Sequence, residues 1–401
     1  MNDAGRKVVD PVRDALTAAG RVITPVGRLV LALSVGAWIV GWRAGWEEAM
    51  WIAAAAGTVC VLAAGFLLGR TELEVAVELE TPRVTAGDVA TGRLEVKNPS
   101  TRRLLPVRME VAVGRSSNRF EIPSLAPGAE HDELFILPTN RRQIIDVGPA
   151  SSVRGDPLGL VRRVVDWTEP TPLFVHPRTT QLEGLGAGFL RDLEGLPTAD
   201  LVDSGVAFHA LREYQPGDDR RFVHWKTTAR VGKLMIRQFI DTRRSHLAIV
   251  LDTQPDAYAS EDGFELAVSI AGSLGARTLR DEQELTFSSG TKAWAPFTAQ
   301  QLLDMLAGIE MSLADRAISE QTAAMRSSAA GVSTLVLVTG SRRELVDAQR
   351  AISRFGSDVR SIVIRAEPDG STGLRAVGSV TVLNVAALDD LGLLLWTVGQ
   401  Q

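Results

Sequence analysis

An uncharged run from Ala49 to Gly69 constrains this 401-residue chain more than any other feature. At about 1.5 Å per residue, a helix of this length spans the roughly 30 Å hydrocarbon core of a bilayer. A second apolar run, from Leu29 to Trp42, lies just before it. The two runs predict a hairpin of membrane-spanning helices over residues 23–43 and 49–69, with a tight turn between them.

The distribution of basic residues predicts the orientation of this hairpin. The connection between the runs carries Arg43 beside two glutamates, Glu47 and Glu48. The residues before the first run include five basic ones: Arg6, Lys7, Arg13, Arg21 and Arg28. Because basic flanks stay on the cytoplasmic side, we expect both ends and the bulk of the chain in the cytoplasm, behind a two-span anchor in the cell membrane. The single Cys60 agrees with a reducing compartment.

Composition excludes several other classes of protein. Charged residues make up 23% and hydrophobic residues 45%, which is typical of a folded chain. One cysteine excludes an intramolecular disulfide framework and a multi-thiolate zinc site. The formal net charge of −5 argues against a chain that binds nucleic acid over its whole surface.

Residues 71–180 have the pattern of an all-β, immunoglobulin-like sandwich. Apolar and charged side chains alternate from Leu73 to Leu79, which predicts a half-buried strand. Turn residues separate further short segments, as in a sandwich of antiparallel sheets. These predicted strands cover residues 89–97, 107–113, 133–137 and 161–166.

The C-terminal part predicts an α/β fold. Apolar strands alternate with helical patterns, which is typical of a doubly wound parallel sheet whose ligands bind at the carboxyl ends of the strands. Strands are expected at 246–252, 284–288, 333–339, 361–366 and 379–385. Helices are expected at 261–281, 298–309, 313–328, 341–355 and 387–398. Thr298 with Gln301, and Ser341 with Glu344, have the spacing of capping boxes.

We therefore divide the chain into five parts. They are a cytoplasmic tail (1–22), two transmembrane helices (23–70), a β-sandwich (71–180), a linker with a dense motif (181–240) and an α/β domain (241–401).

The dense motif lies in residues 211–240. Pro216 and Gly217 predict a turn, after which Asp218 or Asp219 could cap a helix that Gly232 ends. A strand follows from Leu234. At helical spacing, Arg221, Trp225 and Ala229 share one face, and we expect Trp225 in the core and Arg220 on the surface.

This segment is strongly basic. Between Arg212 and Arg244, nine residues are basic and four are acidic, so the segment carries +5 and the rest of the chain −10. With three aromatic residues among them, these cations could bind a phosphate, a nucleic acid or an acidic protein surface. Alternatively, the arginines could form a structural network with Asp218 and Asp219. No recognised nucleic-acid motif frames the patch, so we favour an acidic protein among the binding interpretations.

The motif resembles the signature of the bacterial domain of unknown function 58 family. The matching residues are Arg212, Tyr214, Pro216, Gly217, Asp218, Arg221, Trp225, Ala229 and Arg230, and we add Arg220 and Lys226 as candidate partner-binding residues. The upstream Asp156-Pro157-Leu158-Gly159-Leu160 and the paired apolar runs are also similar to that family. Its members are often encoded beside MoxR-type AAA+ ATPases, so the resemblance implies such an ATPase as the partner. It does not imply a biochemical activity.

The α/β domain resembles a von Willebrand factor type A domain. Such domains can hold Mg²⁺ with Asp-x-Ser-x-Ser after the first strand, together with a later Thr and Asp. Here the first motif is Asp252-Thr253-Gln254-Pro255-Asp256, which lacks both serines. The candidate ligands are Asp252, Asp256 and Thr339. Mg²⁺ needs several oxygen ligands in near-octahedral array, so we expect this set to bind no Mg²⁺, and we expect no other cofactor.

The leading functional hypothesis is a non-enzymatic, membrane-anchored interaction or scaffold protein. Working with a MoxR-type ATPase, it would act in the assembly or maturation of envelope or other protein complexes. The sequence contains no GxxxxGK[ST], HExxH, CxxC pair or GxSxG motif. One alternative is a hydrolase that uses the acidic residues at the strand ends around Asp252. Another is a binding module that faces the envelope, which requires the opposite topology.

Overall fold

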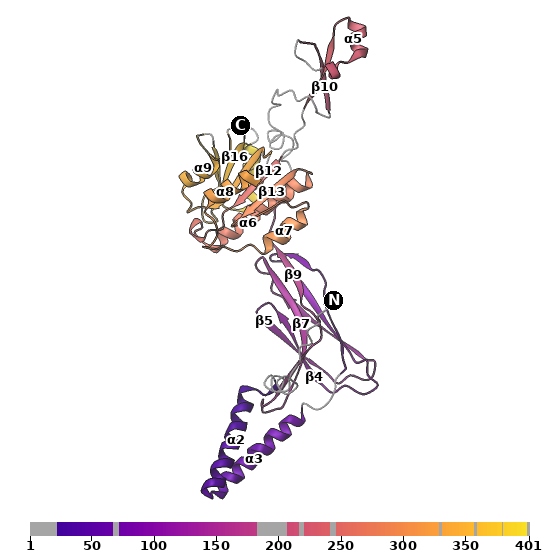
Figure 1. The fold of residues 1–401 in the computed structure, drawn as a ribbon, viewed down its shortest axis with the longest axis vertical. Helices are drawn as coiled ribbons and strands as arrows, with labels where there is room; N and C mark the ends of the chain where they lie inside the picture. The colour runs from indigo at the N-terminus through magenta and orange to yellow at the C-terminus, as the bar shows by residue number, and fades with distance from the viewer. Residues whose placement is uncertain are drawn as a thin grey trace, which may run out of the picture. The chain divides into compact units, whose positions relative to one another are not determined.

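The computed structural model describes most of the chain in two units. The units are Met1–Val175 and His176–Gln401, and each is considered by itself (Figure 1). The described residues are 22–66, 72–182, 207–215, 220–240, 246–328, 331–356, 359–378 and 380–398.

Two apolar helices, α2 (Pro25–Ala44) and α3 (Glu47–Gly65), form the predicted hairpin (Figure 1). Thr24 caps α2 by accepting a 3.0 Å hydrogen bond from the Gly27 N–H, and Gly45 ends it with a φ of 65°. Ser34 donates a 2.8 Å hydrogen bond to the Ala53 carbonyl across the pair. Both helices are long and apolar enough to cross a membrane, which confirms that part of the prediction.

The sandwich consists of two antiparallel sheets. One has the strand order β1-β3-β6, and the other has the order β2-β9-β7-β4-β5 with β8 paired to β7. Their inner faces bury a shared core that includes Leu94, Met109, Val111 and Leu173. The strands are β1 (Glu74–Leu79), β2 (Arg83–Thr85), β3 (Ala90–Lys97), β4 (Val107–Val113), β5 (Ser116–Ile122), β6 (Glu130–Leu137), β7 (Gln143–Gly155), β8 (Arg162–Asp166) and β9 (Thr171–His176).

Four of these strands were not predicted: β2, β5, β7 and β9. Strand β5 begins Ser-Ser-Asn-Arg, so it lacks an apolar pattern, and β7 contains Gly148-Pro149, which normally interrupts a strand. Pairing with neighbouring strands outweighs these local preferences. Strand β7 pairs with β9 through residues 143–147 and with β8 through residues 151–155, and it pairs with β4 through residues 147–153.

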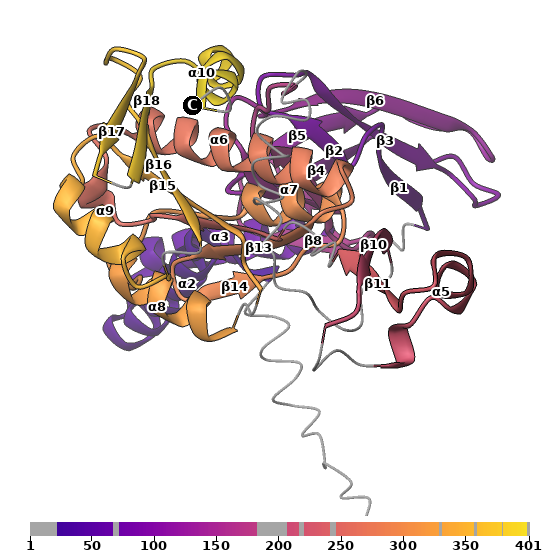
Figure 2. The ribbon, with the colours of Figure 1, turned by 90° about the horizontal axis from the view of Figure 1, so that it is seen from above.

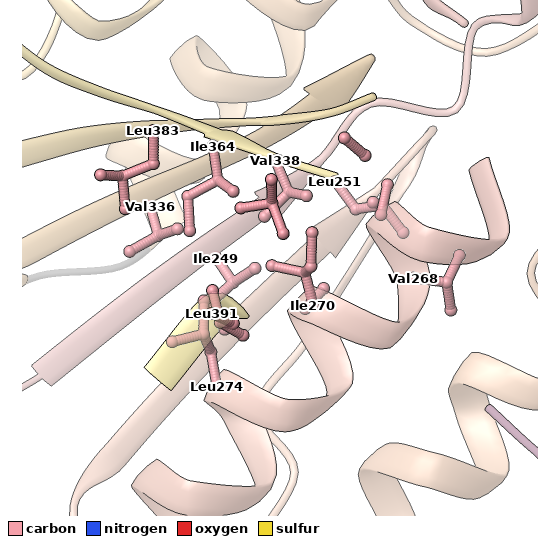
Figure 3. Packing of buried hydrophobic residues seen from close by; sticks show 14 of the residues in the cluster. Ile249, Leu251, Val268, Ile270, Leu274, Val336, Val338, Ile364, Leu383 and Leu391 are labelled. Atoms are coloured by element: carbon pink, nitrogen blue, oxygen red, sulfur yellow. The ribbon is translucent and has the colours of Figure 1, made fainter. Parts of the chain in front are cut away.

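The C-terminal sheet has the order β14-β13-β12-β15-β16-β18-β17. Its central strands are parallel, and the edge strands β14 and β17 are antiparallel to their neighbours. Helices α6, α7 and α10 cover one face and α8 and α9 the other, as in the doubly wound arrangement that was predicted (Figure 2). Ile249, Val338, Ile364 and Leu383 of neighbouring strands pack against Ile270 and other apolar residues of the first layer (Figure 3).

The strands of this sheet are β12 (His246–Leu251), β13 (Glu284–Ser289), β14 (Lys292–Trp294), β15 (Thr334–Gly340), β16 (Arg360–Ala366), β17 (Gly373–Val377) and β18 (Val380–Val385). The helices are α6 (Glu261–Arg280), α7 (Ala299–Ala307), α8 (Ile318–Ser328), α9 (Leu345–Ile352) and α10 (Leu391–Val398), with short 3₁₀ turns η2 (Pro255–Ala257) and η3 (Leu388–Asp390).

The start of α9 corrects the predicted helix 341–355. Thr298 caps α7 as expected, accepting a 3.1 Å hydrogen bond from the Gln301 N–H. The proposed Ser341–Glu344 capping box is wrong, because α9 begins only at Leu345 and Glu344 is its N-cap residue without a side-chain cap. Residues 341–344 form a loop instead, and this loop carries Arg343.

A separate small module contains the dense motif. Strands β10 (Ala207–Glu213) and β11 (Met235–Ile240) pair antiparallel, and the 3₁₀ turn η1 (Arg220–Phe222) and helix α5 (Trp225–Val231) lie between them in the chain (Figure 2). We call residues 207–240 the hairpin module. The predicted turn and cap residues Pro216, Gly217, Asp218 and Asp219 lie outside the described residues.

Candidate functional site

The carboxyl end of the parallel sheet carries a buried carboxylate. Asp252 directly follows β12, and Thr339 is near the end of the neighbouring strand β15. Leu251 pairs with Val338, so the next residues of the two strands lie side by side. Asp252 is 0% exposed, and its Oδ2 accepts a 2.8 Å hydrogen bond from the Thr339 hydroxyl.

Arg343 provides the cation for this carboxylate. Its Nε donates to Asp252 Oδ2 over 2.9 Å, and its Nη2 lies 3.4 Å from Asp252 Oδ1. The same Nη2 contacts Gln254 Oε1 at 3.0 Å and Asp256 Oδ1 at 3.1 Å. The arginine side chain is 12% exposed, whereas that of Asp256 is 65% exposed. The guanidinium therefore lies between a buried and a solvent-facing carboxylate.

The two carboxylates keep Arg343 charged. Burial alone would lower the pKa of Arg343, but the hydrogen bond and the charge of Asp252, followed by those of Asp256, raise it above its usual value. This guanidinium is a permanent positive charge at the sheet edge.

The loop around Asp252 is held by further hydrogen bonds. The Tyr258 hydroxyl donates to the Asp252 carbonyl over 2.5 Å, and the Gln254 N–H donates to Asp252 Oδ1 over 3.1 Å. Burial, with a contribution from the charge of Asp252, raises the pKa of Tyr258 well above its usual range, although Arg343 opposes this shift. The Thr253 hydroxyl donates to Asp315 Oδ2 over 2.6 Å.

The predicted metal ligands Asp252, Asp256 and Thr339 do lie close together, but the cation that contacts their carboxylates is Arg343. Asp252 and Thr339 hydrogen-bond each other, and Asp256 contacts the guanidinium that binds Asp252. A cation already fills the centre of this oxygen cluster, so the side chains present do not fit a Mg²⁺ ion. Within the described parts of the chain, no group of three or more His, Cys, Asp or Glu residues is placed to hold a metal.

Arg343 was not identified from the sequence. Its only signal is the Ser341-Arg342-Arg343 sequence that directly follows a buried strand, and the helix predicted from Ser341 concealed this signal.

In the hairpin module, the family-motif residues lie on several elements. Arg212 is in β10, Arg220 and Arg221 are in η1, and Lys226, Ala229 and Arg230 are in α5. Tyr214 follows β10, and its N–H donates to the Leu234 carbonyl over 2.8 Å. The Lys233 ammonium lies 3.0 Å from the Glu213 carboxylate.

Three expectations for α5 are wrong. His224, not an aspartate, is its N-cap residue, and His224 Nδ1 accepts a 3.2 Å hydrogen bond from the Thr227 N–H. Trp225 is 67% exposed and is not a core anchor. Val223 and Ile236, which form a β-bridge, are buried instead, at 5% and 6%. The helix begins only at Trp225, so Arg221 and Trp225 do not share a helical face. Gly232 ends α5 as predicted, with a φ of 74°.

The surface of the hairpin module is rich in cations. Arg220, Lys226 and Arg230 are exposed near the exposed Trp225 in the chain. Residues 207–240 contain seven basic and three acidic residues, a net charge of +4, which leaves −9 for the rest of the chain. The module therefore combines an exposed aromatic ring with a positive charge opposite in sign to that of the whole protein.

Comparisons with solved structures find only distant likeness. The chain is similar to the CARDB domain of PF1109 from Pyrococcus furiosus, with 16% identity and a TM-score of 0.21 over 27% of this chain and 95% of that one. It is also similar to the C-terminal domain of wzt, with 13% identity and a TM-score of 0.20 over 27% of this chain and 75% of that one. Such low scores do not bear on function.

Sequence comparison is more specific. The curated "Uncharacterized protein YeaD" of Bacillus subtilis (strain 168) is 29% identical over 128 residues, which is 30% of this chain and 29% of that protein. The chain therefore matches less than a third of its relative's length. Residues 210–381, which include most of the hairpin module and most of the parallel sheet, match the family described as "Protein of unknown function DUF58".

Proposed function

We propose that this protein is a membrane-anchored, non-enzymatic interaction protein whose hairpin module binds an acidic surface of a partner protein. The exposure of Trp225 within a cationic module carries the proposal. Tryptophan has a large apolar surface, and leaving it 67% in water has no benefit for folding. Trp and Arg are the residues most enriched at the energetic centres of protein interfaces.

Charge supports an acidic partner. The exposed cations near Trp225, among them Arg220, Lys226 and Arg230, would attract a negative surface and orient it during encounter. Through the resemblance of the motif, the expected partner is a MoxR-type AAA+ ATPase.

Membrane anchoring by α2 and α3 is the second part of the proposal. Their length and apolar surface support it, because Trp42, Trp51 and Val61 are at least 72% exposed on the outer faces of these helices. The basic residues before α2 support an orientation with both ends in the cytoplasm.

We call the part of the chain that contains the seven-stranded sheet and its helices, residues 246–398, the α/β unit. We propose that it is von Willebrand factor type A-like. Its parallel strand order and the Asp252 loop at the carboxyl edge support this assignment. The hydrolase alternative has less support, because the Asp252 carboxylate is buried and is hydrogen-bonded by Thr339 and Arg343. A carboxylate in that state is not available to activate a water molecule for attack on a substrate.

The proposal can be tested by binding measurements on the full chain in lipid nanodiscs. A purified MoxR-type ATPase of the same organism is the probe, and the dissociation constant is measured at low and high salt. We expect Trp225→Ala to weaken binding about tenfold or more, as interface tryptophans do, and Arg220→Glu to weaken it and to reduce its salt dependence.

Two variants serve as matched controls. Trp396→Ala removes a tryptophan that is 54% exposed on α10, and Arg375→Glu reverses an exposed charge on β17. Both should bind like the parent chain. Equal binding by the parent and Trp225→Ala would contradict the assignment of the module, and no binding by the parent would contradict the expected partner.

A further inference from the structure

We infer that Arg343 is a built-in replacement for a divalent cation, so that the carboxyl edge of the α/β unit is held together without metal. This inference concerns the Asp252 loop and is independent of the proposed role of the hairpin module.

The first argument is the occupancy of the carboxylate oxygens. Asp252 Oδ2 accepts hydrogen bonds from Thr339 and Arg343. Asp252 Oδ1 accepts one from the Gln254 N–H and is contacted by Arg343 Nη2. Donors from the protein already surround both oxygens, so a metal ion would have to displace them.

The second argument is charge. Mg²⁺ requires oxygen ligands at about 2.1 Å in a near-octahedral arrangement. An ion bound by Asp252 would lie close to a guanidinium that both carboxylates keep protonated. A metal ion bound to Asp252 and the Arg343 guanidinium, which donates to the same carboxylate, would therefore repel each other strongly in this poorly solvated place. Arg343 thus supplies the positive charge that Asp252 needs and excludes a second one.

The third argument is that the backbone places Arg343 at this position. Strand β15 ends at Gly340, where a Cβ atom would lie 2.2 Å from the Ala257 carbonyl oxygen. The Arg342 N–H donates a 3.0 Å hydrogen bond to the same carbonyl, and the Arg365 guanidinium donates to the Ser341 carbonyl. These hydrogen bonds hold the first two residues of the loop, Ser341 and Arg342, in place. The side chain of the next residue, Arg343, then reaches Asp252.

The inference has a specific consequence. Removing the guanidinium leaves four oxygen-bearing side chains around one place: Asp252, Gln254, Asp256 and Thr339. Oxygen ligands with two carboxylates suit Mg²⁺ or Mn²⁺. A chain without the arginine charge should therefore respond to these metals, although the parent chain should not.

The test is thermal unfolding of the full chain in detergent, with EDTA, MgCl₂ or MnCl₂ added. The parent chain should melt at the same temperature in all three. Arg343→Gln leaves Asp252 buried without its cation, so it should melt about 5 °C or more lower in EDTA and recover part of that loss with Mn²⁺ or Mg²⁺. Arg350→Gln removes an exposed arginine paired with Asp347 and is the matched control, expected to match the parent in every condition.

A second variant separates metal binding from general stabilisation. Asp252→Asn combined with Arg343→Gln lacks the buried charge, so it should lose the metal response. If Arg343→Gln does not fold, Arg343→Lys keeps a cation in place and should fold and remain insensitive to both metals.

Three results with the parent chain or Arg343→Gln would overturn the inference. They are calorimetric binding of Mg²⁺ to the parent chain, an Arg343→Gln chain that melts like the parent in EDTA, and a destabilised Arg343→Gln chain that neither metal stabilises. Stabilisation of Arg343→Lys by Mg²⁺ would count equally against it.

Discussion

The side chain of Arg343 is 12% exposed, whereas Trp225 is 67% exposed. Arginine normally lies at the surface and tryptophan is usually well buried. Arg343 is mostly buried because it contacts two carboxylates, one of which, Asp252, is 0% exposed. In the hairpin module, Val223 and Ile236, which form a β-bridge, are buried, whereas Trp225 is not. At the scale of single residues, the available partners decide burial.

The exposure of Trp225 leads to a prediction about local stability. Trp225→Ala should change the free energy of local opening of the hairpin module by less than about 1 kcal/mol, as exposed substitutions usually do. Val223→Ala should lower it by about 2 kcal/mol, because it removes buried methyl groups. Hydrogen–deuterium exchange of β10 and β11 in the full chain measures both effects. Faster exchange in Trp225→Ala than in Val223→Ala would show that the assigned buried and exposed sides are reversed.

The buried phenol of Tyr258 leads to a prediction about alkaline pH. Burial raises the pKa of Tyr258 in the folded chain above its unfolded value of about 10. The protonated form is thus favoured in the folded state, so the stabilisation is complete below pH ~10 and is lost as the pH rises above that value. Unfolding then releases one additional proton, and stability should fall by about 1.4 kcal/mol per pH unit from this group.

Tyr258→Phe tests this assignment. It should be less stable than the parent chain at neutral pH by about 1 kcal/mol, because the hydrogen bond to the Asp252 carbonyl is lost. The deficit should shrink or vanish above pH 10, since phenylalanine does not ionise. Thermal melts between pH 8 and 11 measure this difference, and a deficit that grows with pH would contradict it.

The end of β15 and the start of α9 show how an element boundary positions a side chain. A helix beginning at Ser341 would have placed Arg343 in its first turn. Because α9 begins at Leu345, residues 341–344 form a loop that turns back toward Asp252. The boundary is set by the close approach of Gly340 to the Ala257 carbonyl and by the hydrogen bond of that carbonyl to the Arg342 N–H.

Gly340→Ala should therefore destabilise the α/β unit. The new methyl group would meet the Ala257 carbonyl oxygen at 2.2 Å, which requires the backbone to move. We expect a loss of about 1–3 kcal/mol, as in other overpacked sites. Gly373→Ala on the edge strand β17 is the matched control, since nothing lies within 4 Å of its Cβ position and its φ is not positive. Thermal melts of the full chain compare the two, and equal melting temperatures would refute the role given to Gly340.

On the scale of the whole molecule, the chain joins parts of different physical character. Helices α2 and α3 have exposed apolar faces, the sandwich and the α/β unit each bury a core of their own, and the hairpin module carries a charge opposite to that of the rest. These parts offer separate surfaces for the anchoring and partner-binding roles proposed above.

The proposed topology can be measured directly. Four basic residues precede α2 and Arg28 lies in its first turn, whereas Arg43 is the one basic residue at its other end, so both termini should lie in the cytoplasm. A C-terminal reporter that is active only in the cytoplasm should be active, and one that is active only outside should be silent. Replacing the five N-terminal basic residues by Gln should reduce this preference. An externally active C-terminal reporter would favour the alternative of a module that faces the envelope.

Local patterns in the sequence were sufficient for much of the fold. The apolar runs in α2 and α3, the alternation in β1 and the apolar strands β12 and β15 reflect burial that repeats along one element. Burial of this kind can be predicted from one segment of the sequence, because the apolar residues repeat within that segment. The strands β5 and β7 were missed because their residues favour turns, and they become strands through pairing with distant segments.

The candidate sites depended more on the tertiary structure. The sequence by itself determined that Asp252 follows a buried strand and that residues 211–240 are basic and aromatic. Only the tertiary structure decided that Arg343, 91 positions away, pairs with Asp252 and that Trp225 remains exposed. The physical reason is that a buried charge is stabilised by whichever opposite charge the fold brings within hydrogen-bond distance, and no local pattern contains that distance.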